Sequence, residues 1–249
     1  MNNHIDSRKS KVSKKKYSIS AFFPVYNDWG TISSIVFLVD GLLEKVASDY
    51  EIILVDDGSN AITKRVLEEL SIKIPKLKVV THYKNKGYGA ALKTGIYNSR
   101  FDLIFYTDGD AQYNPEELKL LLPKLDDDID IVNGYKISRS DPVYRKILGK
   151  LYHYITKLMF GFKIKDVDCD FRLMRKKIFH DIILEYNSGV ICVEMITKIA
   201  KRGYKFAEVP VHHYYRVSGK SEFFNFIRIF QVMKNLIKLW YKIQIKKEY

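Results

Sequence analysis

The segment EIILVDDGS at residues 51–59 is the clearest indication of the fold. Residues 51–55 are almost continuously apolar and predict a strand, which the acidic turn at 56–59 ends. A strand without alternation of polar and apolar residues is typical of a parallel sheet that is covered on both faces. We therefore expect this segment to be a buried parallel strand with carboxylates at its carboxyl end.

The same arrangement repeats through the first half of the chain, where predicted strands alternate with predicted helices. This order is typical of an α/β fold with a parallel sheet. The predicted strands are 19–25, 51–55, 77–81, 103–107 and 129–133, and the predicted helices are 32–47, 61–70, 88–99 and 115–125. The second half is less regular, with helices predicted at 150–162, 190–201 and 223–247 and strands at 170–175 and 207–212.

Composition and charge restrict the class of protein. The 249 residues are 47% hydrophobic and 14% aromatic, enough for a folded core, and the net charge of +13 favours a polyanionic partner: nucleic acid, anionic lipid or a phosphorylated substrate. Two cysteines, Cys169 and Cys192, exclude a disulfide framework and a four-cysteine zinc site. Without a signal-peptide pattern or a spanning apolar run, we expect an intracellular protein. We expect a basic tail at 1–16, one domain at 17–222 and a basic helix at 223–249.

Carboxylates follow three of the predicted strands, and ligands of parallel sheets gather at the carboxyl ends of strands. These residues are Asp28, Asp56, Asp57, Asp108 and Asp110. Two carboxylates separated by one glycine, as at 108–110, can hold a hard divalent cation that keeps positions for phosphate oxygens. An ordinary Asp-Gly turn is the alternative reading of this motif.

Other strand ends supply candidates for nucleotide binding. Asp56 or Asp57 can accept hydrogen bonds from a base or a ribose, or can form a turn with Ser59. Pro24 and Tyr26 can provide an apolar wall for a base. The segment NKGYG at 85–89 lacks the spacing of a dinucleotide-binding or phosphate-binding loop, so we expect close backbone packing there.

Two basic segments lie in the last part of the chain. The loop RVSGKS at 216–221 carries Arg216 and Lys220, and such a loop can fold over a diphosphate. The predicted helix at 223–247 has aromatic and aliphatic residues on one side, lysine and arginine on the other, and no acid. This pattern is typical of a helix that lies in the plane of an anionic membrane. A helix docked on the core or at a subunit interface is the alternative, and the helix at 150–162 is a possible companion.

Taken together, these motifs resemble glycosyltransferase family 2, and within it the branch of dolichyl- or polyprenyl-phosphate sugar synthases. The resemblance covers about residues 18–222. It rests on PVYN at 24–27, VDDGS at 55–59, Asn85 with Gly87 and Gly89, DGDAQ at 108–112, Asp166 with FRL at 171–173, and EVPV at 208–211 followed by Arg216 and Gly219.

The resemblance implies a GT-A fold, a Rossmann-like three-layer α/β fold with a mostly parallel sheet, here followed by an amphipathic helix. It implies a GDP- or UDP-linked sugar as donor and Mg²⁺ or Mn²⁺ as cofactor. The implied nucleotide-binding residues are Pro24, Tyr26, Asp28, Asp56 and Asp57. The implied metal ligands are Asp108, Asp110 and Gln112, with Gln112 and Arg216 at the diphosphate. The implied catalytic residues are Asp110 and, at the acceptor phosphate, Lys136 and Arg145.

The chain departs from the pattern of this branch at three places. Asp28 replaces a usual Glu, and Lys136 replaces a frequent Arg, which keeps the charge but loses the bidentate fork. Asp168, Cys169 and Asp170 replace Thr-Ser-Gly and add negative charge on the acceptor side.

We expect an inverting transfer to a polyprenyl phosphate at the cytoplasmic face of a membrane, in the synthesis of a cell-envelope component or another glycan. A phosphate oxygen needs no protein base, because the second pKa of a phosphomonoester is about 6. A first alternative is transfer to a saccharide hydroxyl, which needs a base, and Asp168 or Asp170 can serve. A second alternative is a non-enzymatic nucleic-acid-binding module. It explains the charge, but the carboxylates at the strand ends would repel a nucleic acid, so we expect no nucleic-acid partner.

Overall fold

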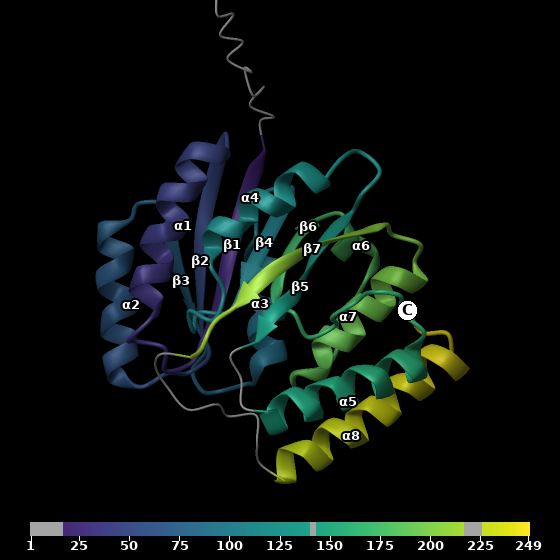
Figure 1. Cartoon of the computed structure of the whole chain (residues 1–249). Coiled ribbons are helices and arrows are strands. Elements are labelled where there is room, and N and C mark those ends of the chain that lie inside the picture. The colour runs from purple at the N-terminus through teal and green to yellow at the C-terminus, as the bar shows by residue number, and fades with distance from the viewer. Residues whose placement is uncertain (1–16, 140–142, 217–225) are drawn as a thin grey trace, which may run out of the picture.

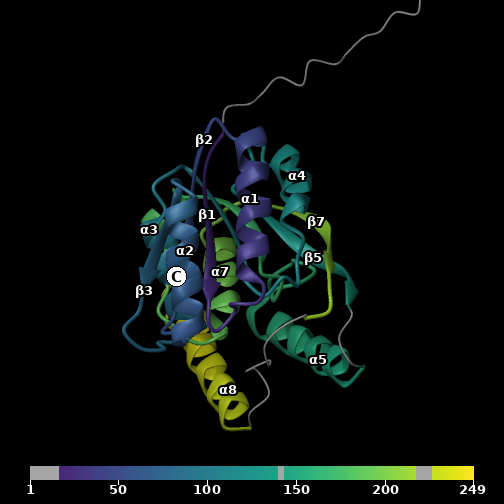
Figure 2. The same ribbon diagram turned by 90° about the vertical axis from the view of Figure 1, so that its left-hand side faces the viewer.

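The computed structural model describes residues 17–139, 143–216 and 226–249, without the side chains of 138–139, 143–145 and 226–229. Its middle layer is a seven-stranded sheet with the order β3-β2-β1-β4-β6-β5-β7. Helices cover both faces of the sheet (Figure 1), and α1 and α3 lie on opposite sides of β1 (Figure 2). The predicted three-layer α/β fold with a mostly parallel sheet is confirmed.

The first half of the chain follows the predicted pattern closely. Its elements are β1 (Ser18–Val25), α1 (Ile32–Val46), β2 (Asp49–Asp56), α2 (Ala61–Lys73), β3 (Leu77–Thr81), α3 (Tyr88–Asn98) and β4 (Leu103–Thr107). All four strands are parallel, so their carboxyl ends lie at one edge of the sheet. This is the lower end of the molecule in Figure 1.

The second half supplies the rest of the sheet and its cover. Its elements are η1 (Pro115–Glu117), α4 (Leu118–Leu121), η2 (Leu122–Lys124), β5 (Ile131–Arg139), α5 (Val143–Phe160), β6 (Phe171–Arg175), α6 (Ile178–Asp181), α7 (Val190–Lys201), β7 (Phe206–His213), α8 (Phe226–Trp240) and the π-helical turn η3 (Tyr241–Ile245). Strand β6 runs antiparallel to both β4 and β5.

Three predicted elements differ clearly from the structure. The helix predicted at 150–162 begins earlier, as α5 at Val143. The helix predicted at 115–125 is three short helical turns, and Pro123, which has no backbone N–H, lies in the last of them. Strand β5 runs past the predicted end at Asn133, because it pairs with β7 as far as Arg139. Because of this pairing, Lys136 lies within a strand. Gly134 resembles a strand end in the sequence, but here it allows close packing, since a Cβ built there would lie 3.0 Å from Cys169 Sγ.

Each face of the sheet has its own apolar core. One core packs α1, α2 and α4 on the sheet, and the other packs α3, α7 and α8 on the opposite face. Both Cys169 and Cys192 are buried as free thiols. None of the helices in the described part of the chain is long and apolar enough to cross a membrane.

The carboxyl-terminal helix has one docked and one exposed side. Leu236, Leu239 and Ile243 are buried in the core, as expected for a core-docked helix, whereas Phe230 and Ile237 are 72% and 58% exposed. Three predicted segments lie outside the described residues: the tail at 1–16, the basic loop beyond Arg216 at 217–221, and residues 223–225 of the predicted helix.

Candidate active site at the carboxyl ends of the strands

Three acidic turns meet at the carboxyl end of the sheet. Asp28 follows β1, Asp56 ends β2, and Asp108 follows β4. The register places Val25 beside Asp56, which brings the first two turns together. Asp57, Asp108 and Asp110 come with them, so the structure brings the predicted carboxylates of the three strands to one rim.

Asp110 is buried, and both of its carboxylate oxygens accept hydrogen bonds. Oδ1 accepts from the backbone N–H of Gln112 at 3.0 Å, which is the Asp-Gly turn that the sequence allowed. Oδ2 accepts from Nη2 of Arg216 at 2.7 Å and from its Nε at 3.2 Å. Arg216 therefore meets the turn after β4, although 106 residues separate the two side chains.

Asp108 lies in an electrostatically unfavourable position for a carboxylate. Its Oδ1 accepts a hydrogen bond from the Tyr88 hydroxyl at 2.9 Å. Burial raises the pKa of Asp108 well above its ordinary value, and the neighbouring carboxylates of Asp170 and Asp110 raise it further. Burial likewise raises the pKa of Asp28 to about 6, with a smaller contribution from Asp110. A bound cation would relieve this repulsion.

Asp56 and Asp57 use their carboxylates within the protein. Asp56 Oδ1 accepts from the Ser59 N–H at 2.8 Å, which is the turn alternative. Asp57 Oδ1 lies 2.6 Å from His82 Nδ1, and Asp57 Oδ2 accepts from the Gly87 N–H at 2.8 Å. The two residues thus shape the loops of the rim, and contact with a nucleotide stays a prediction.

The expected backbone packing at residues 85–89 is confirmed. Gly87 has φ of 98°, and a Cβ built there would lie 2.5 Å from the carbonyl oxygen of Asn187. A Cβ at Gly89 would lie 2.4 Å from the carbonyl oxygen of Tyr186. The two glycines thus allow this segment to pack closely against the backbone of residues 186–187.

The apolar side of the rim contains one residue that was not predicted from the sequence. Pro24 is buried in β1, and Tyr26 beyond it is 40% exposed. Trp29 lies next to Asp28 in the sequence and is 49% exposed. A tryptophan shortly after a predicted strand was the signal available in the sequence, because bases stack well on aromatic side chains.

Gln112 joins the turn after β4 to the end of β7. Its side-chain Nε2 donates to the Tyr214 carbonyl at 3.1 Å, and its own carbonyl accepts from the Tyr214 N–H at 2.8 Å. The bond to the Tyr214 carbonyl uses the amide nitrogen of the Gln112 side chain, so it does not involve the amide oxygen. These bonds hold residue 214, and with it Arg216, near the acidic rim.

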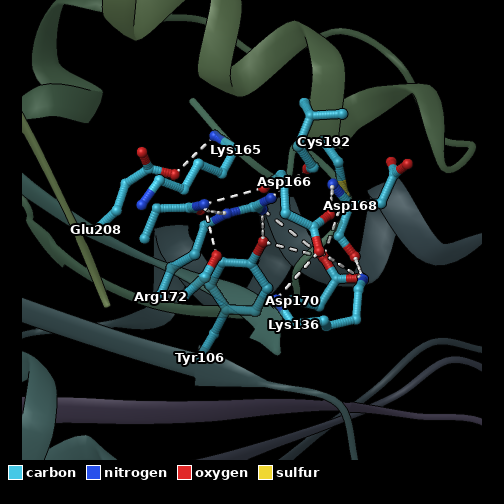
Figure 3. Close-up of polar contacts among 12 residues, drawn as sticks. Tyr106, Lys136, Lys165, Asp166, Asp168, Asp170, Arg172, Cys192 and Glu208 are labelled. Carbon is cyan, nitrogen blue, oxygen red and sulfur yellow. Dashed lines mark hydrogen bonds and ion pairs between the residues drawn. The ribbon is translucent and has the colours of Figure 1, made fainter. Parts of the chain in front are cut away.

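A second polar cluster lies beside the rim, around β5 and β6 (Figure 3). Lys136 Nζ donates to the Asp168 carbonyl at 2.6 Å and lies 3.4 Å from Asp166 Oδ2. Burial opposes the charge of Lys136, but the acids around it, Asp166 first, give a raised pKa. Lys136 is therefore a buried, charged and paired side chain. The side chain of Arg145, its predicted companion near the start of α5, lies outside the described side chains.

Arg172 is the fully buried centre of this cluster. Its Nε donates to Asn133 Oδ1 at 2.6 Å, its Nη2 to the Val167 carbonyl at 2.5 Å, and its Nη1 to the Tyr106 hydroxyl. The Asp170 carboxylate accepts from Tyr106 at 3.3 Å and from the Cys192 thiol at 3.2 Å. Neither Tyr106 nor Tyr88 was predicted as a site residue, because nothing local in the sequence indicates their partners.

Asp168 is a further carboxylate of this cluster. Burial and the nearby acids raise the pKa of Asp168 to about 7, against a lowering effect of Lys136. A carboxyl with this pKa can accept a proton near neutral pH. Since Asp170 is also the strongest charged neighbour of Asp108, the second cluster adjoins the turn after β4.

The predicted metal site offers two carboxylates from one turn. Among the described residues, no three His, Cys, Asp or Glu side chains are grouped as a complete metal site. A magnesium site in a phosphate-binding enzyme commonly has only one or two carboxylates, with phosphates and water completing it. The pair Asp108 and Asp110 fits this kind of site.

Comparison with known proteins decides the family. The family model described as "Glycosyl transferase family 2" matches residues 20–183, which include the acidic turns, Lys136 and Arg172. The chain belongs to glycosyl transferase family 2. This glycosyltransferase is therefore an enzyme, and the alternative of a non-enzymatic nucleic-acid-binding module is wrong.

Solved structures confirm the GT-A fold. A crystal structure of a mycobacterial protein has 16% identity and a TM-score of 0.69, over 91% of this chain and 74% of the other. Glucosyl-3-phosphoglycerate synthase from Mycobacterium tuberculosis, in complex with Mn²⁺, UDP and glucosyl-3-phosphoglycerate, has 15% identity and a TM-score of 0.69, over 91% and 79%. The same synthase with Mg²⁺ and UDP has 13% identity and a TM-score of 0.68, over 91% and 79%. The enzyme named among these similar structures is thus not a polyprenyl-phosphate sugar synthase.

Proposed function

We propose that this glycosyltransferase transfers a sugar from a GDP- or UDP-linked donor to a polyprenyl phosphate at the surface of an anionic membrane. The reaction is inverting, and Mg²⁺ or Mn²⁺ is the cofactor. The observation that carries the choice of acceptor is the pair of exposed apolar helix faces on α5 and α8, at the same end of the molecule as the acidic rim.

The donor side follows from the chemistry of the rim. Asp108 and Asp110, with the side-chain oxygen of Gln112, would hold the divalent cation. When bound, this ion neutralises charge on the departing diphosphate. Arg216 is our candidate for a direct hydrogen-bond donor to the diphosphate. The bound UDP and Mn²⁺ or Mg²⁺ of the synthase with the same fold support this assignment.

The membrane side follows from the exposed residues of two helices. Both helices lie at the same end of the molecule as the carboxyl ends of the strands (Figures 1 and 2). The exposed apolar side chains are Ile147, Leu148, Leu151, Tyr154 and Leu158 on α5, and Phe230, Met233, Ile237, Tyr241 and Ile245 on α8 and η3. Neither α5 nor α8 contains an acidic residue. Apolar faces with lysines and arginines but no acids fit an anionic lipid surface.

The acceptor phosphate needs cationic partners, and the sequences of β5 and of the start of α5 supply them. A phosphate monoester is largely ionised at neutral pH, so its oxygen attacks without a protein base. We assign its binding to Arg145 and Lys136. The ammonium of Lys136 already contacts the Asp168 carbonyl, so an entering phosphate must share or replace this contact.

Transfer to a hydroxyl acceptor is the second candidate, and one observation favours it. The pKa of Asp168 at about 7 suits a general base at neutral pH. Asp170 suits this role less well, because its carboxylate accepts hydrogen bonds from Tyr106 and Cys192. A phosphorylated acceptor with a free hydroxyl, such as the 3-phosphoglycerate of the synthase with the same fold, belongs to this class.

The acceptor classes are separated by one experiment. The purified protein is incubated with Mg²⁺ and labelled UDP-glucose or GDP-mannose, together with undecaprenyl phosphate in anionic vesicles, 3-phosphoglycerate or a free disaccharide. We expect label in the lipid fraction only, and similar lipid transfer by the variant Asp168→Asn. Label in a water-soluble product that depends on Asp168 would instead establish the hydroxyl acceptor.

A further inference from the structure

Arg216 is bound among the carboxylates that form the predicted metal site. Its guanidinium donates two hydrogen bonds to one oxygen of Asp110, Oδ2, at 2.7 and 3.2 Å. The charged neighbours that stabilise its positive charge are Asp110, Asp28 and Asp108, in that order. The positive charge of this one guanidinium thus lies among three carboxylates, one that follows β1 and two that follow β4.

A divalent cation at this site would compete with Arg216 for the carboxylate of Asp110. Oδ1 of Asp110 is held by the backbone N–H of Gln112 at 3.0 Å, within the turn. Oδ2 accepts two hydrogen bonds from Arg216. Two positive groups cannot share one buried carboxylate oxygen without strong repulsion, so the cation and the guanidinium exclude each other there.

The backbone next to Arg216 keeps it within reach after it leaves Asp110. Tyr214 is joined to Gln112 by two hydrogen bonds of 2.8 and 3.1 Å, which do not involve the carboxylate of Asp110. The side chain of Arg216 is 28% exposed and belongs to neither apolar core. A diphosphate that accompanied the cation would offer the guanidinium a new anionic partner.

We infer that Arg216 is a placeholder for the divalent cation: it pairs with Asp110 until the cation binds, and it then transfers its hydrogen bonds to the donor diphosphate. The inference rests on the proposed metal-dependent function. It adds an exchange step that couples the two ligands. Displacing Arg216 opposes binding of the cation alone, whereas the diphosphate gives the displaced guanidinium a new partner, so each ligand favours the other.

The test measures binding of Mn²⁺ itself, by its electron paramagnetic resonance signal, in the absence of nucleotide. The variant Arg216→Gln removes the competing charge and keeps most of the side-chain stem. We expect it to bind Mn²⁺ about tenfold more tightly than the natural chain, the order expected for a partly buried charge-assisted pair. With saturating Mn²⁺, we expect UDP or GDP, whichever the natural chain binds, to bind about tenfold more weakly to this variant.

Two controls accompany the variant. Arg216→Lys keeps one charge but loses the two-pronged contact, and its Mn²⁺ affinity should lie between the other two. Arg100→Gln removes another arginine that pairs with a carboxylate, Glu51 at 3.6 Å, at the opposite end of the sheet, and should change neither affinity.

Mn²⁺ affinity of Arg216→Gln that equals that of the natural chain, or is weaker, overturns the exchange and leaves the proposed function intact. Absence of Mn²⁺ binding from every variant, also with UDP or GDP present, overturns both. A rise in Mn²⁺ affinity with Arg100→Gln as well would show a general charge effect and overturn the specific exchange.

Discussion

The donor side and the acceptor side of the active-site rim are built in different ways. On the donor side, the turns are closed locally, because Asp56 and Asp110 accept hydrogen bonds from backbone N–H groups three and two residues further along the chain. The long-range bond from Arg216 to Asp110 adds to such a turn and does not form it. On the acceptor side, Lys136 meets Asp168 across 32 residues and Arg172 meets Tyr106 across 66.

This difference has consequences for function and stability. The local turns of the donor side keep their shape when a single carboxylate loses its charge, so substitutions there should affect binding and catalysis. The long-range network on the acceptor side joins several elements in the interior, so substitutions there should affect the free energy of unfolding. Four predictions test this contrast and the proposed membrane surface, in decreasing order of the change that we expect.

The largest effect is expected for Asp110→Asn, which keeps the turn but removes the charge. We expect sugar transfer to fall by about a thousandfold, the order seen when a group that stabilises the transition state is removed. The melting temperature should change little. Asp128→Asn, at an exposed acid paired with Lys205 at 3.1 Å, is the matched control for activity. Turnover of Asp110→Asn near that of the control contradicts the donor site.

The next effect concerns the acceptor side and is structural. Arg172→Met leaves Asn133, Tyr106 and the Val167 carbonyl without their buried donor. We expect the free energy of unfolding to fall by about 3–5 kcal/mol, as for the loss of one partner of a buried charged network. Urea unfolding measures it. Lys177→Met, at a surface pair with Asp130, is the control and should change it by less than about 1 kcal/mol. A small loss for Arg172→Met would remove the contrast between the two sides.

A third effect concerns the membrane surface of α5 and α8. Deletion of α8 is a poor test, because Leu236 and Leu239 belong to the core. The double variant Leu151→Ser with Ile237→Ser changes only exposed residues. We expect its partition onto anionic vesicles to fall at least about tenfold, since each buried aliphatic side chain contributes about 1.5 kcal/mol or more. Ile62→Ser with Ile72→Ser on α2, where both side chains are also exposed, is the control, and equal partition of both double variants contradicts the membrane surface.

The smallest effect is the pH dependence of Asp168. Its folded-state pKa is about 7, above the ordinary value of 3.8, so the folded state holds the proton more tightly between these values. The stabilisation is complete below about pH 4 and is lost as the pH rises through 7. In the variant Asp168→Asn, the unfolding free energy should fall less between about pH 4 and pH 7, and the difference from the natural chain should be about 1–2 kcal/mol. The difference is modest because the Asp168 side chain is only half-buried. Asp128→Asn should leave the slope unchanged, and an unchanged slope in both variants refutes the raised pKa.

The first half of the fold and the donor rim could be predicted from the amino-acid sequence. Unbroken apolar runs such as 51–55 specify buried parallel strands, and the residues that end them specify the turns. Since parallel strands end at one edge, Asp28, Asp57 and Asp108 had to approach one another. The predicted strand at 103–107 coincides with β4 for the same local reason.

The acceptor side and the partner of Arg216 became visible only in the folded chain. The end of β5 depends on pairing with β7, and the contacts of Lys136, Arg172 and Tyr88 join segments that no local pattern connects. Hydrophobic periodicity reports which face of an element is buried, and turn residues report where it ends, but neither reports which polar groups meet in the interior. That pairing depends on the packing of distant elements against one another.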